Sequence, residues 1–275
     1  MTSTTDVQRL LRAAGYYAGD IDGDIGPKSR AAIRKVLEAN AARLSADWSR
    51  WSRKRQMVLA AQVILKAAGF EVGVFDGYAG MLTKQALTDW NELQATGKRP
   101  APWRPDDAPE ADDDARPLPA WGKQRDVERR FGPAGGAQCT AGRVQLPYMM
   151  RIAWNLADTI QSFACHEAVA DSVERVLGRV ASAYAPEAIT RLGLDLFGGC
   201  FNLRKKRGGS TLSMHAYGVA IDFDPERNQL KWDRDRARLA KADADEWWRC
   251  WEAEGWLSLG RARDFDWMHV QAPGL

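Results

Sequence analysis

The sequence predicts two domains, an all-α helical bundle followed by an α+β domain. Three features of the sequence support this fold class: a segment that recurs within the first hundred residues, a Pro- and Asp-rich stretch after it, and short glycine-flanked apolar runs near the C-terminus. With 275 residues, the chain is long enough for two domains that each bury a hydrophobic core.

The N-terminal repeat is the clearest sign of organisation. Residues 7–33 recur as residues 61–87, shifted by 54 positions. The matched pairs include Gln8 and Gln62, Leu11 and Leu65, Asp22 and Asp76, Gly23 and Gly77, and Ser29 and Thr83. Each copy predicts a helix ended by a glycine, an Asp-Gly turn, and a second helix capped by the Ser or Thr.

This repeated unit resembles the peptidoglycan-binding domain of cell-wall hydrolases, whose pattern runs from an LQ-type helix through G, DG, G and T to a second helix. The resemblance implies that residues 1–96 bind the cell wall. It also makes the turn residues candidates for the wall-binding loops, namely Asp22, Gly23, Asp76 and Gly77. The alternative is that a small bundle needs these glycines only for its turns.

Two segments of this domain could instead indicate other ligands. Asp20, Asp22 and Asp24 have the first spacings of an EF-hand loop, but Ile25 stands where Gly is needed and Ala31 where Glu is needed, which excludes calcium. The basic and aromatic residues 48–55 could grip an anionic polymer or nucleic acid, although a solvated helix face explains them better.

Residues 97–119 differ in composition from the segments on either side. They are rich in Pro, Ala and Asp and too poor in apolar residues to form a core. We therefore expect a stiffened, extended linker that joins the first domain to a second one at residues 120–275.

Overall composition excludes several classes of protein. The 39 basic and 36 acidic residues nearly cancel to +3, so we expect no nucleic-acid partner. No apolar run approaches the roughly 18 residues of a membrane span, and the first residues lack the pattern of a secretory signal. Cys139, Cys165, Cys200 and Cys250 show no CxxC spacing and are expected to be reduced thiols, with disulfides only outside a cell.

The second domain is expected to begin with helices and end with strands. Apolar periodicity predicts helical structure from about residue 146 to residue 185. Three partly alternating segments then predict a small antiparallel sheet, at residues 194–199, 218–224 and 266–271.

Two of the three histidines lie at these predicted strands. His215 precedes a strand across Gly218, whose freedom to bend can bring the imidazole beside Asp222. Near the C-terminus, His269 follows Asp266 by three residues. A His, Asp, His set leaves one tetrahedral position open for water, which is typical of catalytic zinc.

These residues also carry a family resemblance. The motif SxHxxGxAxD is present as Ser213, His215, Gly218, Ala220 and Asp222, and DxxH follows as Asp266 and His269. The motifs resemble those of the zinc peptidases that include D-Ala-D-Ala carboxypeptidases and L-Ala-D-Glu endopeptidases. The resemblance implies that His215, Asp222 and His269 hold one Zn²⁺ and that Asp266 is the catalytic carboxylate, where many relatives carry Glu.

An arginine upstream of the first motif would stabilise the oxyanion formed in amide hydrolysis. Arg204 and Arg207 are the candidates, with Arg204 favoured, and solvated loop charges are the alternative.

Four further residues have less specific predicted roles. Ser213 is expected to orient a ligand or contact substrate, since no nucleophile elbow surrounds it. Tyr217 and Trp267 flank the ligands and are predicted either to line the substrate cleft or to belong to the core. His166 is expected to be a buried structural histidine within the helical stretch.

Together these features predict zinc-dependent hydrolysis of an amide bond in peptidoglycan stem peptides. We expect a monomeric L-Ala-D-Glu-type endopeptidase that acts as a phage endolysin, held in the host cytoplasm until its release to the cell wall. The alternatives are a D-Ala-D-Ala carboxypeptidase, a bacterial autolysin, or a non-catalytic, zinc-stabilised wall-binding protein, against which Asp266 speaks. Glycan cleavage by paired carboxylates finds no support in the sequence.

Overall fold

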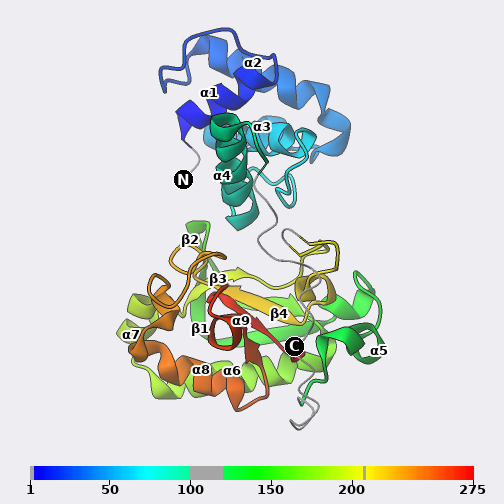
Figure 1. Cartoon of the computed structure of the whole chain (residues 1–275), viewed down its shortest axis with the longest axis vertical. Helices are drawn as coiled ribbons and strands as arrows, with labels where there is room; N and C mark the ends of the chain where they lie inside the picture. The colour runs from blue at the N-terminus through cyan, green and yellow to red at the C-terminus, as the bar shows by residue number, and fades with distance from the viewer. Residues whose placement is uncertain (1–2, 100–119, 207–208) are drawn as a thin grey trace. The chain divides into compact units, whose positions relative to one another are not determined.

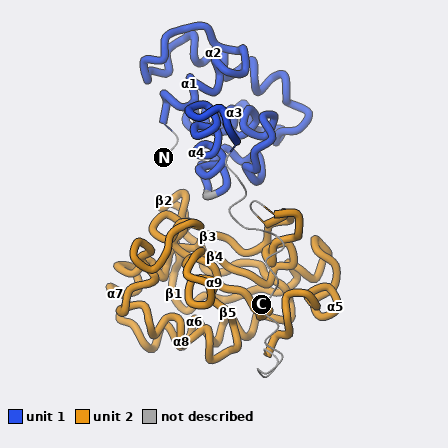
Figure 2. Tube along the Cα trace, in the orientation of Figure 1, with its two compact units in different colours: residues 1–101 blue, residues 102–275 orange. Residues whose placement is uncertain are grey.

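A computed structural model describes residues 3–99, 120–206 and 209–275. The chain divides into two compact units, residues 1–101 and 102–275 (Figure 2). Most of the predicted linker lies outside the described residues. Within the described segments, we find no helix with both the length and the apolar character that crossing a bilayer requires. The four cysteines are buried and free of disulfides.

The first unit is helical, as predicted (Figure 1). Its described residues form α1 (Thr4–Ala13), α2 (Pro27–Ala39), α3 (Arg53–Ala67) and α4 (Met81–Thr96), with short 3₁₀ turns η1 (Ala41–Arg43) and η2 (Trp48–Arg50) between the two pairs. The apolar faces of the helices meet in one core, in which Leu10, Leu37, Leu59 and Leu65 are fully buried. The two repeat copies therefore form one bundle.

The second helix of each copy begins differently from the prediction. Gly26 and Gly80 occupy the N-cap positions of α2 and α4, and neither helix has a side-chain cap. Ser29 and Thr83 were expected to be the caps but lie inside the first turn, almost fully buried. Their hydroxyls face the loop within each copy, where they accept hydrogen bonds from Gln8 and Gln62 respectively.

The second unit is built on a mixed sheet. Its described strands are β1 (Gly142–Ile152), β2 (Asn155–Cys165), β3 (Leu196–Gly199), β4 (Ala220–Phe223), β5 (Leu257–Ser258) and β6 (His269–Gln271). They are arranged in the order β2-β1-β3-β4-β6-β5, with β1 and β3 parallel and every other pair antiparallel. The α+β class is confirmed, and the sheet is larger than the small antiparallel one predicted and includes one parallel pair.

The added strands come from a segment that was predicted to be helical. Residues 142–165 form the β1–β2 hairpin, and the helix α6 extends only over Ala170–Ala183. Burial alternates along much of β1, and Pro147 would remove a hydrogen bond from the interior of a helix. The apolar residues of this segment fit both the period of a helix and the alternation of a strand. The helical prediction was therefore wrong for the first half of the segment.

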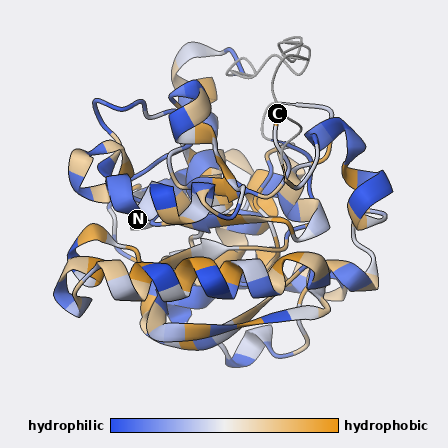
Figure 3. Ribbon diagram, turned by 90° about the horizontal axis from the view of Figure 1, so that it is seen from below, coloured by the Kyte–Doolittle hydropathy of each residue, from blue (hydrophilic) through white to orange (hydrophobic). Residues whose placement is uncertain are grey.

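Helices cover the sheet and complete the core (Figure 1). The α-helices are α5 (Val127–Phe131), α6, α7 (Pro186–Leu192), α8 (Asp245–Glu252) and α9 (Leu259–Arg263). The 3₁₀ turns are η3 (Gln124–Asp126), η4 (Ala137–Thr140), η5 (Glu167–Val169), η6 (Met214–Tyr217), η7 (Arg238–Ala240) and η8 (Ala242–Ala244). α6 packs against β1 and α8, and the helices show hydrophilic and hydrophobic residues in alternation (Figure 3).

A tryptophan cluster on α8 supports the strand that carries Asp222. Trp247, Trp248 and Trp251 are almost completely buried. The ring of Phe223 meets Trp247 edge-on with centroids 4.8 Å apart and lies 5.6 Å from the ring of Trp251. This packing anchors β4 through the residue next to Asp222.

Candidate metal centre

Three side chains converge in the second unit. The Nε2 atom of His215 lies 3.2 Å from Oδ1 of Asp222 and 3.2 Å from Nδ1 of His269, which itself lies 3.0 Å from the same oxygen. All three residues are buried. Among the described residues, they form the one group of potential metal ligands whose donor atoms lie this close together.

The triangle of donor atoms has the size that a tetrahedral zinc ion needs. Zinc bonds to histidine nitrogen and carboxylate oxygen are about 2.0–2.1 Å long, which places two donors of a tetrahedron about 3.3 Å apart. The observed separations of 3.0 to 3.2 Å are close to that value. The donor set of two imidazoles and one carboxylate therefore fits zinc.

Strand pairing positions two of these residues. Asp222 on β4 and His269 on β6 are direct partners in the antiparallel register. Side chains of directly opposed residues lie on the same face of a sheet. The pairing therefore places the carboxylate and the imidazole on one face, next to each other.

A tight turn brings His215 to the same place. The residue lies in η6, where the hydroxyl of Ser213 accepts a hydrogen bond from its backbone N–H at 3.4 Å. Gly218 ends the turn in the left-handed region, with φ of 67°, and a Cβ atom there would collide with the carbonyl oxygen of Cys139. The predicted bend at Gly218 is confirmed, and glycine is needed there for both reasons.

Hydrogen bonds on the far side of each ring determine which nitrogen faces the centre. His215 Nδ1 lies 2.6 Å from the carbonyl oxygen of Cys200, which can only accept, so this nitrogen donates. On the second ring, His269 Nε2 lies 3.2 Å from Oε1 of Gln271. The nitrogens that face Asp222 then present lone pairs. These two nitrogens and the Asp222 oxygen are all electron-rich, so a cation bound between them would be stabilised by all three.

The charge of Asp222 suits a metal ligand. Burial by itself would raise the pKa of this carboxyl, but the charge and hydrogen bonds of His215 and His269, when these rings are protonated, hold its pKa well below the usual range. Asp222 is therefore a carboxylate throughout the neutral range.

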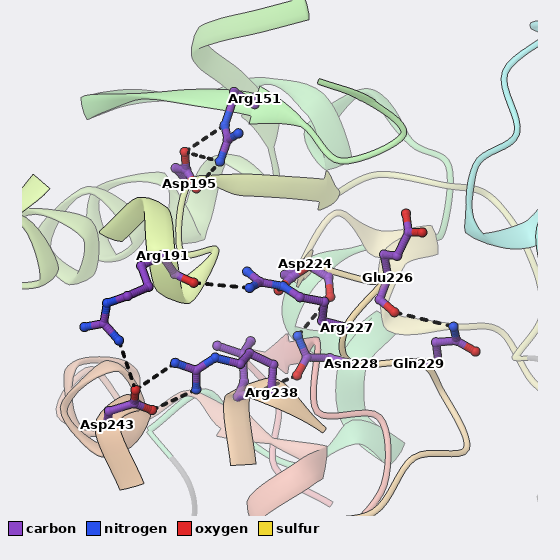
Figure 4. A network of polar contacts seen from close by, with 11 residues as sticks. Arg151, Arg191, Asp195, Asp224, Glu226, Arg227, Asn228, Gln229, Arg238 and Asp243 are labelled. Carbon is purple, nitrogen blue, oxygen red and sulfur yellow. Dashed lines mark hydrogen bonds and ion pairs between the residues drawn. The ribbon is translucent and has the colours of Figure 1, made fainter. Parts of the chain in front are cut away.

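A polar network fixes the end of β4 just beyond Asp222 (Figure 4). Asp224 is buried with φ of 44°, and its carboxylate accepts from Arg227 Nε at 2.6 Å. Burial outweighs this cation and raises the pKa of Asp224 to about 6. The side chain of Asn228 donates to the backbone carbonyl of Asp224 at 2.9 Å and accepts the N–H of Leu239 at 2.7 Å. The loop after β4 is thereby tied to the strand.

Asp266 lies beside this centre in the chain but outside the group of converging ligands. It is buried at a turn before β6, with φ of 58°. Its N–H donates to the carbonyl of Leu230 at 3.0 Å, and its own carbonyl accepts the N–H of His269 at 3.0 Å. The turn thus ties the backbone of Asp266 to a predicted ligand.

The predicted oxyanion arginines lie in the loop that leads to His215. The carbonyl of Arg204 accepts the N–H of Ser213 at 3.0 Å, and Lys205 pairs with Leu212 in an isolated bridge. The backbone of Arg204 therefore lies next to Ser213, where the turn that contains His215 begins. Arg207 lies outside the described residues.

Tyr217 and Trp267 are both buried in the core. The Tyr217 hydroxyl donates to Glu128 at 3.0 Å, and burial together with Glu128 raises its pKa to about 12. Trp267 donates from Nε1 to Asp264 at 3.2 Å, and its ring covers Gly260. Of the two alternatives for these rings, the structure favours the core over the substrate cleft.

His166 is a buried structural histidine, although the helix predicted around it is absent from the described structure. It follows β2 at the N-cap of η5. Its Nε2 lies 2.8 Å from the carbonyl oxygen of Phe131, and its Nδ1 accepts the N–H of Ala168 at 3.0 Å. Both ring nitrogens are used for structure.

The predicted wall-binding loops are each closed by a buried glutamine. Gln8 donates to Asp22 Oδ1 at 2.7 Å and accepts the N–H of Gly23 at 2.9 Å. The hydrogen bond from Gln8, together with a backbone N–H, lowers the pKa of Asp22. In the second copy, Gln62 makes the corresponding bonds to Asp76 and Gly77, at 3.0 and 2.9 Å. Asp22 and Asp76 thus have structural roles within their loops.

The two loops differ in what covers them. Gly77 is buried, and a Cβ atom there would lie 2.6 Å from the carbonyl oxygen of Arg55. The side chain of Arg55 also donates from Nε to the carbonyl of Asp76 at 2.8 Å. A Cβ atom at Gly23 would instead meet only the hydroxyl oxygens of Thr4 and Thr5, at 3.7 and 3.3 Å. Arg55 therefore covers the second loop.

The sequence interpretation missed the glutamines at both sites. Gln8 and Gln62 were matched in the repeat but assigned no role, although identical polar residues within apolar helix faces are a signal for a buried contact. Gln271 has no motif of its own, but it follows His269 by two residues in a strand and so shares its face.

Comparisons with known families agree with both halves of the chain. A family model described as D-alanyl-D-alanine carboxypeptidase matches residues 207–272, and one described as a peptidoglycan binding domain matches residues 2–36. The first match includes the three converging side chains. No curated protein and no solved structure matches the chain. The two matches thus agree with the modular organisation predicted from the sequence, with a peptidoglycan-binding segment in the first unit and a carboxypeptidase-like peptidase segment in the second.

Proposed function

We propose that this modular chain is a zinc peptidase that hydrolyses an amide bond in the stem peptides of peptidoglycan. The observation that supports it best is the convergence of His215 Nε2, Asp222 Oδ1 and His269 Nδ1 within the segment that matches the carboxypeptidase family. Buried imidazole nitrogens and a carboxylate oxygen are typical zinc ligands. Peptidoglycan as the substrate follows from the wall-binding match in the same chain.

The proposed chemistry gives each residue a separate task. Zinc, when bound by the three ligands, would polarise the scissile carbonyl and make a water molecule more acidic. The carboxylate of Asp266 would take the proton from the attacking water and return it to the departing amine. Arg204 would stabilise the negative charge that develops on the carbonyl oxygen, with Arg207 as the alternative.

The bond we propose is the one between L-Ala and D-Glu, which makes the protein an endopeptidase. The second candidate is a D-Ala-D-Ala carboxypeptidase, which the description of the matching family favours. The two activities differ in their products: an endopeptidase exposes amino groups within the stem peptide, whereas the carboxypeptidase releases free D-alanine.

We further propose that the protein acts as a phage endolysin. A wall-binding domain on a tether raises the local concentration of substrate for a peptidase domain, which suits an enzyme that must degrade an insoluble polymer. In this proposal the protein is a monomer, stays in the host cytoplasm and reaches the wall at lysis. A bacterial autolysin would have the same two domains and a different route to the wall.

Digestion of purified peptidoglycan tests the proposal. New amino groups, new reducing ends and released D-alanine are assayed separately, with the His215→Ala variant as the control for contaminating activity. New amino groups without D-alanine are the expected result. D-alanine release would replace the endopeptidase with the carboxypeptidase, and reducing ends alone would overturn the peptidase. A protein that sediments with the wall and yields none of the three products would be a binding protein without turnover.

A further inference from the structure

We propose that Gln271 is a positioning residue that sets the tautomer of His269, so that Nδ1 of this ring is free of a proton and faces the metal. The inference rests on the proposed zinc site. It assigns a task to a side chain that belongs neither to the ligand set nor to the proposed catalytic groups.

The contact between the two side chains is direct and buried. Gln271 Oε1 lies 3.2 Å from His269 Nε2, on the side of the ring away from Asp222. The two residues are two positions apart in β6, and alternate residues of a strand share a face. Gln271 is only 2% exposed, so water does not compete for this hydrogen bond.

A second hydrogen bond determines which end of the Gln271 amide faces His269. Gln271 Nε2 lies 2.7 Å from the carbonyl oxygen of Pro273 and 3.4 Å from Oε1 of Gln124. The Pro273 carbonyl can only accept, so the NH₂ group must point toward it. The amide oxygen of Gln271 therefore faces His269, and the ring must donate to it from Nε2.

The neutral ring of His269 carries one proton, and this contact holds it on Nε2. Nδ1 then presents its lone pair toward Asp222 Oδ1, 3.0 Å away, and toward His215 Nε2, 3.2 Å away. In the other tautomer, the lone pair of Nε2 would face the amide oxygen of Gln271 and the metal-facing nitrogen would be blocked by a proton. Gln271 thus favours the form of His269 that can bind a metal.

The two ligand histidines differ in the group that sets their tautomer. The ring of His215 is held by the backbone carbonyl of Cys200, which no substitution removes. The ring of His269 is held by a side chain. The tautomer of one ligand can therefore be tested by mutation while the other remains as an internal reference.

The first experiment measures zinc affinity by competition with a chelator. Gln271→Met keeps the length of the side chain but removes the amide oxygen, and we expect affinity to fall about 10- to 100-fold. Gln271→Glu keeps an oxygen acceptor for His269 but turns a second oxygen toward the Pro273 carbonyl. It should retain affinity within a few-fold of the wild type and lose folding stability. Gln62→Met, the same change at a buried glutamine of the first unit, is the matched control and should leave zinc affinity unchanged.

The second experiment reads the hydrogen bond itself. In the zinc-bound protein, NMR should show the Nε2–H proton of His269 protected from exchange with water in the wild type, because Gln271 accepts it. In zinc-bound Gln271→Met this proton should exchange faster, while the Nδ1–H proton of His215, held by the Cys200 carbonyl, should be unchanged in both proteins.

The outcomes separate this inference from the proposed function. A wild-type protein that binds no zinc would overturn the zinc peptidase and this inference together. A wild type that binds zinc, with a Met variant that binds equally tightly and protects the Nε2–H proton equally well, would overturn only the role of Gln271. A folded Glu variant with zinc affinity about 10-fold or more below that of the wild type would overturn it too, and this result does not require the Met variant to fold.

Discussion

Gln8 and Gln62, at positions 54 residues apart, make matching hydrogen bonds to an aspartate, a glycine and a later backbone carbonyl. Each amide donates to the side chain of an aspartate and accepts the N–H of the glycine that follows it, and each also donates to a backbone carbonyl two residues after that aspartate. The loop of each copy is therefore folded around one buried amide.

Loss of either amide should destabilise the first unit. Gln8→Leu and Gln62→Leu each leave a glycine N–H and other polar groups of a loop without their partner, which costs about 1–3 kcal/mol. Urea unfolding followed by circular dichroism measures the loss. Gln94→Leu, at an exposed position of α4, is the control and should change stability by less than about 0.5 kcal/mol. A Gln8 variant as stable as this control would contradict the structural role of the amide.

Wall binding should depend on the first unit, and cleavage of a small substrate should not. Deletion of residues 1–96 is expected to weaken sedimentation with insoluble peptidoglycan, because the wall-binding match lies in that segment. Cleavage of a soluble stem peptide should be unchanged, since the three converging side chains are all in the second unit. Equal sedimentation of the full-length and shortened proteins would argue against a wall-binding role.

Metal binding and catalysis should separate in two variants. His215→Ala removes one converging ligand and should lose zinc. Asp266→Ala should keep zinc, because the three ligands remain, and lose about 10²- to 10⁴-fold in turnover as expected for a missing general base. Zinc content by elemental analysis and peptide hydrolysis by chromatography measure the two effects. Normal turnover by Asp266→Ala would refute the proposed role of this residue.

Gly218→Ala should be far more damaging than alanine at an unconstrained glycine. The backbone at Gly218 has φ of 67°, and the added methyl group would collide with the Cys139 carbonyl. We expect a loss of at least about 2 kcal/mol in the free energy of unfolding. Gly178→Ala is the matched control, because Gly178 lies inside α6 with no atom near its added Cβ, and should be neutral or stabilising by up to about 1 kcal/mol. Similar effects of the two changes would show that the turn can relax.

The stabilising contribution of Glu254 should disappear in acid. Its carboxylate is 9% exposed and accepts from Arg175 and Arg179 at 2.8 Å, and the hydrogen bond from Arg175 is the main reason that its pKa is lowered. A lowered pKa means that the stabilisation is present above the ordinary pKa of a glutamate and is lost as pH falls through the lowered value.

We therefore expect Glu254→Gln to be less stable than the wild type by about 1 kcal/mol at pH 7, because the partner arginines are partly exposed to solvent. At pH about 3 the two proteins should approach each other in stability. Urea unfolding at both values tests this. Glu246→Gln, in an exposed pair with Arg249, is the control and should have little effect at either pH. A difference that persists unchanged in acid would show that the carboxylate charge is not responsible.

The convergence of His215 and Asp222 could be predicted from the sequence because it depends on local geometry. The alternation of side chains along residues 218–224 and the bend allowed by Gly218 depend on a few neighbouring residues. The DxxH motif predicted His269 as the third ligand. Its position beside Asp222, however, depends on pairing between β4 and β6, and the two residues are 47 positions apart in the chain.

The β1–β2 hairpin was harder to predict. Its apolar residues satisfy a helical period almost as well as an alternating one, and its place in the sheet depends on the parallel pairing of β1 with β3. The role of Gln271 also cannot be predicted from local sequence. The role of a glutamine depends on what each end of its amide faces, and here one end faces a ligand and the other a backbone carbonyl.

The register between Asp222 and His269 has a consequence for how the protein is made. β6 follows all the other strands in the chain, so a nascent polypeptide emerging from the ribosome presents His215 and Asp222 before it has a third ligand. A slip of one residue between β4 and β6 would turn His269 to the opposite face of the sheet. Zinc uptake would then report the completion and correct pairing of this sheet, and a chain interrupted before His269 should remain without metal.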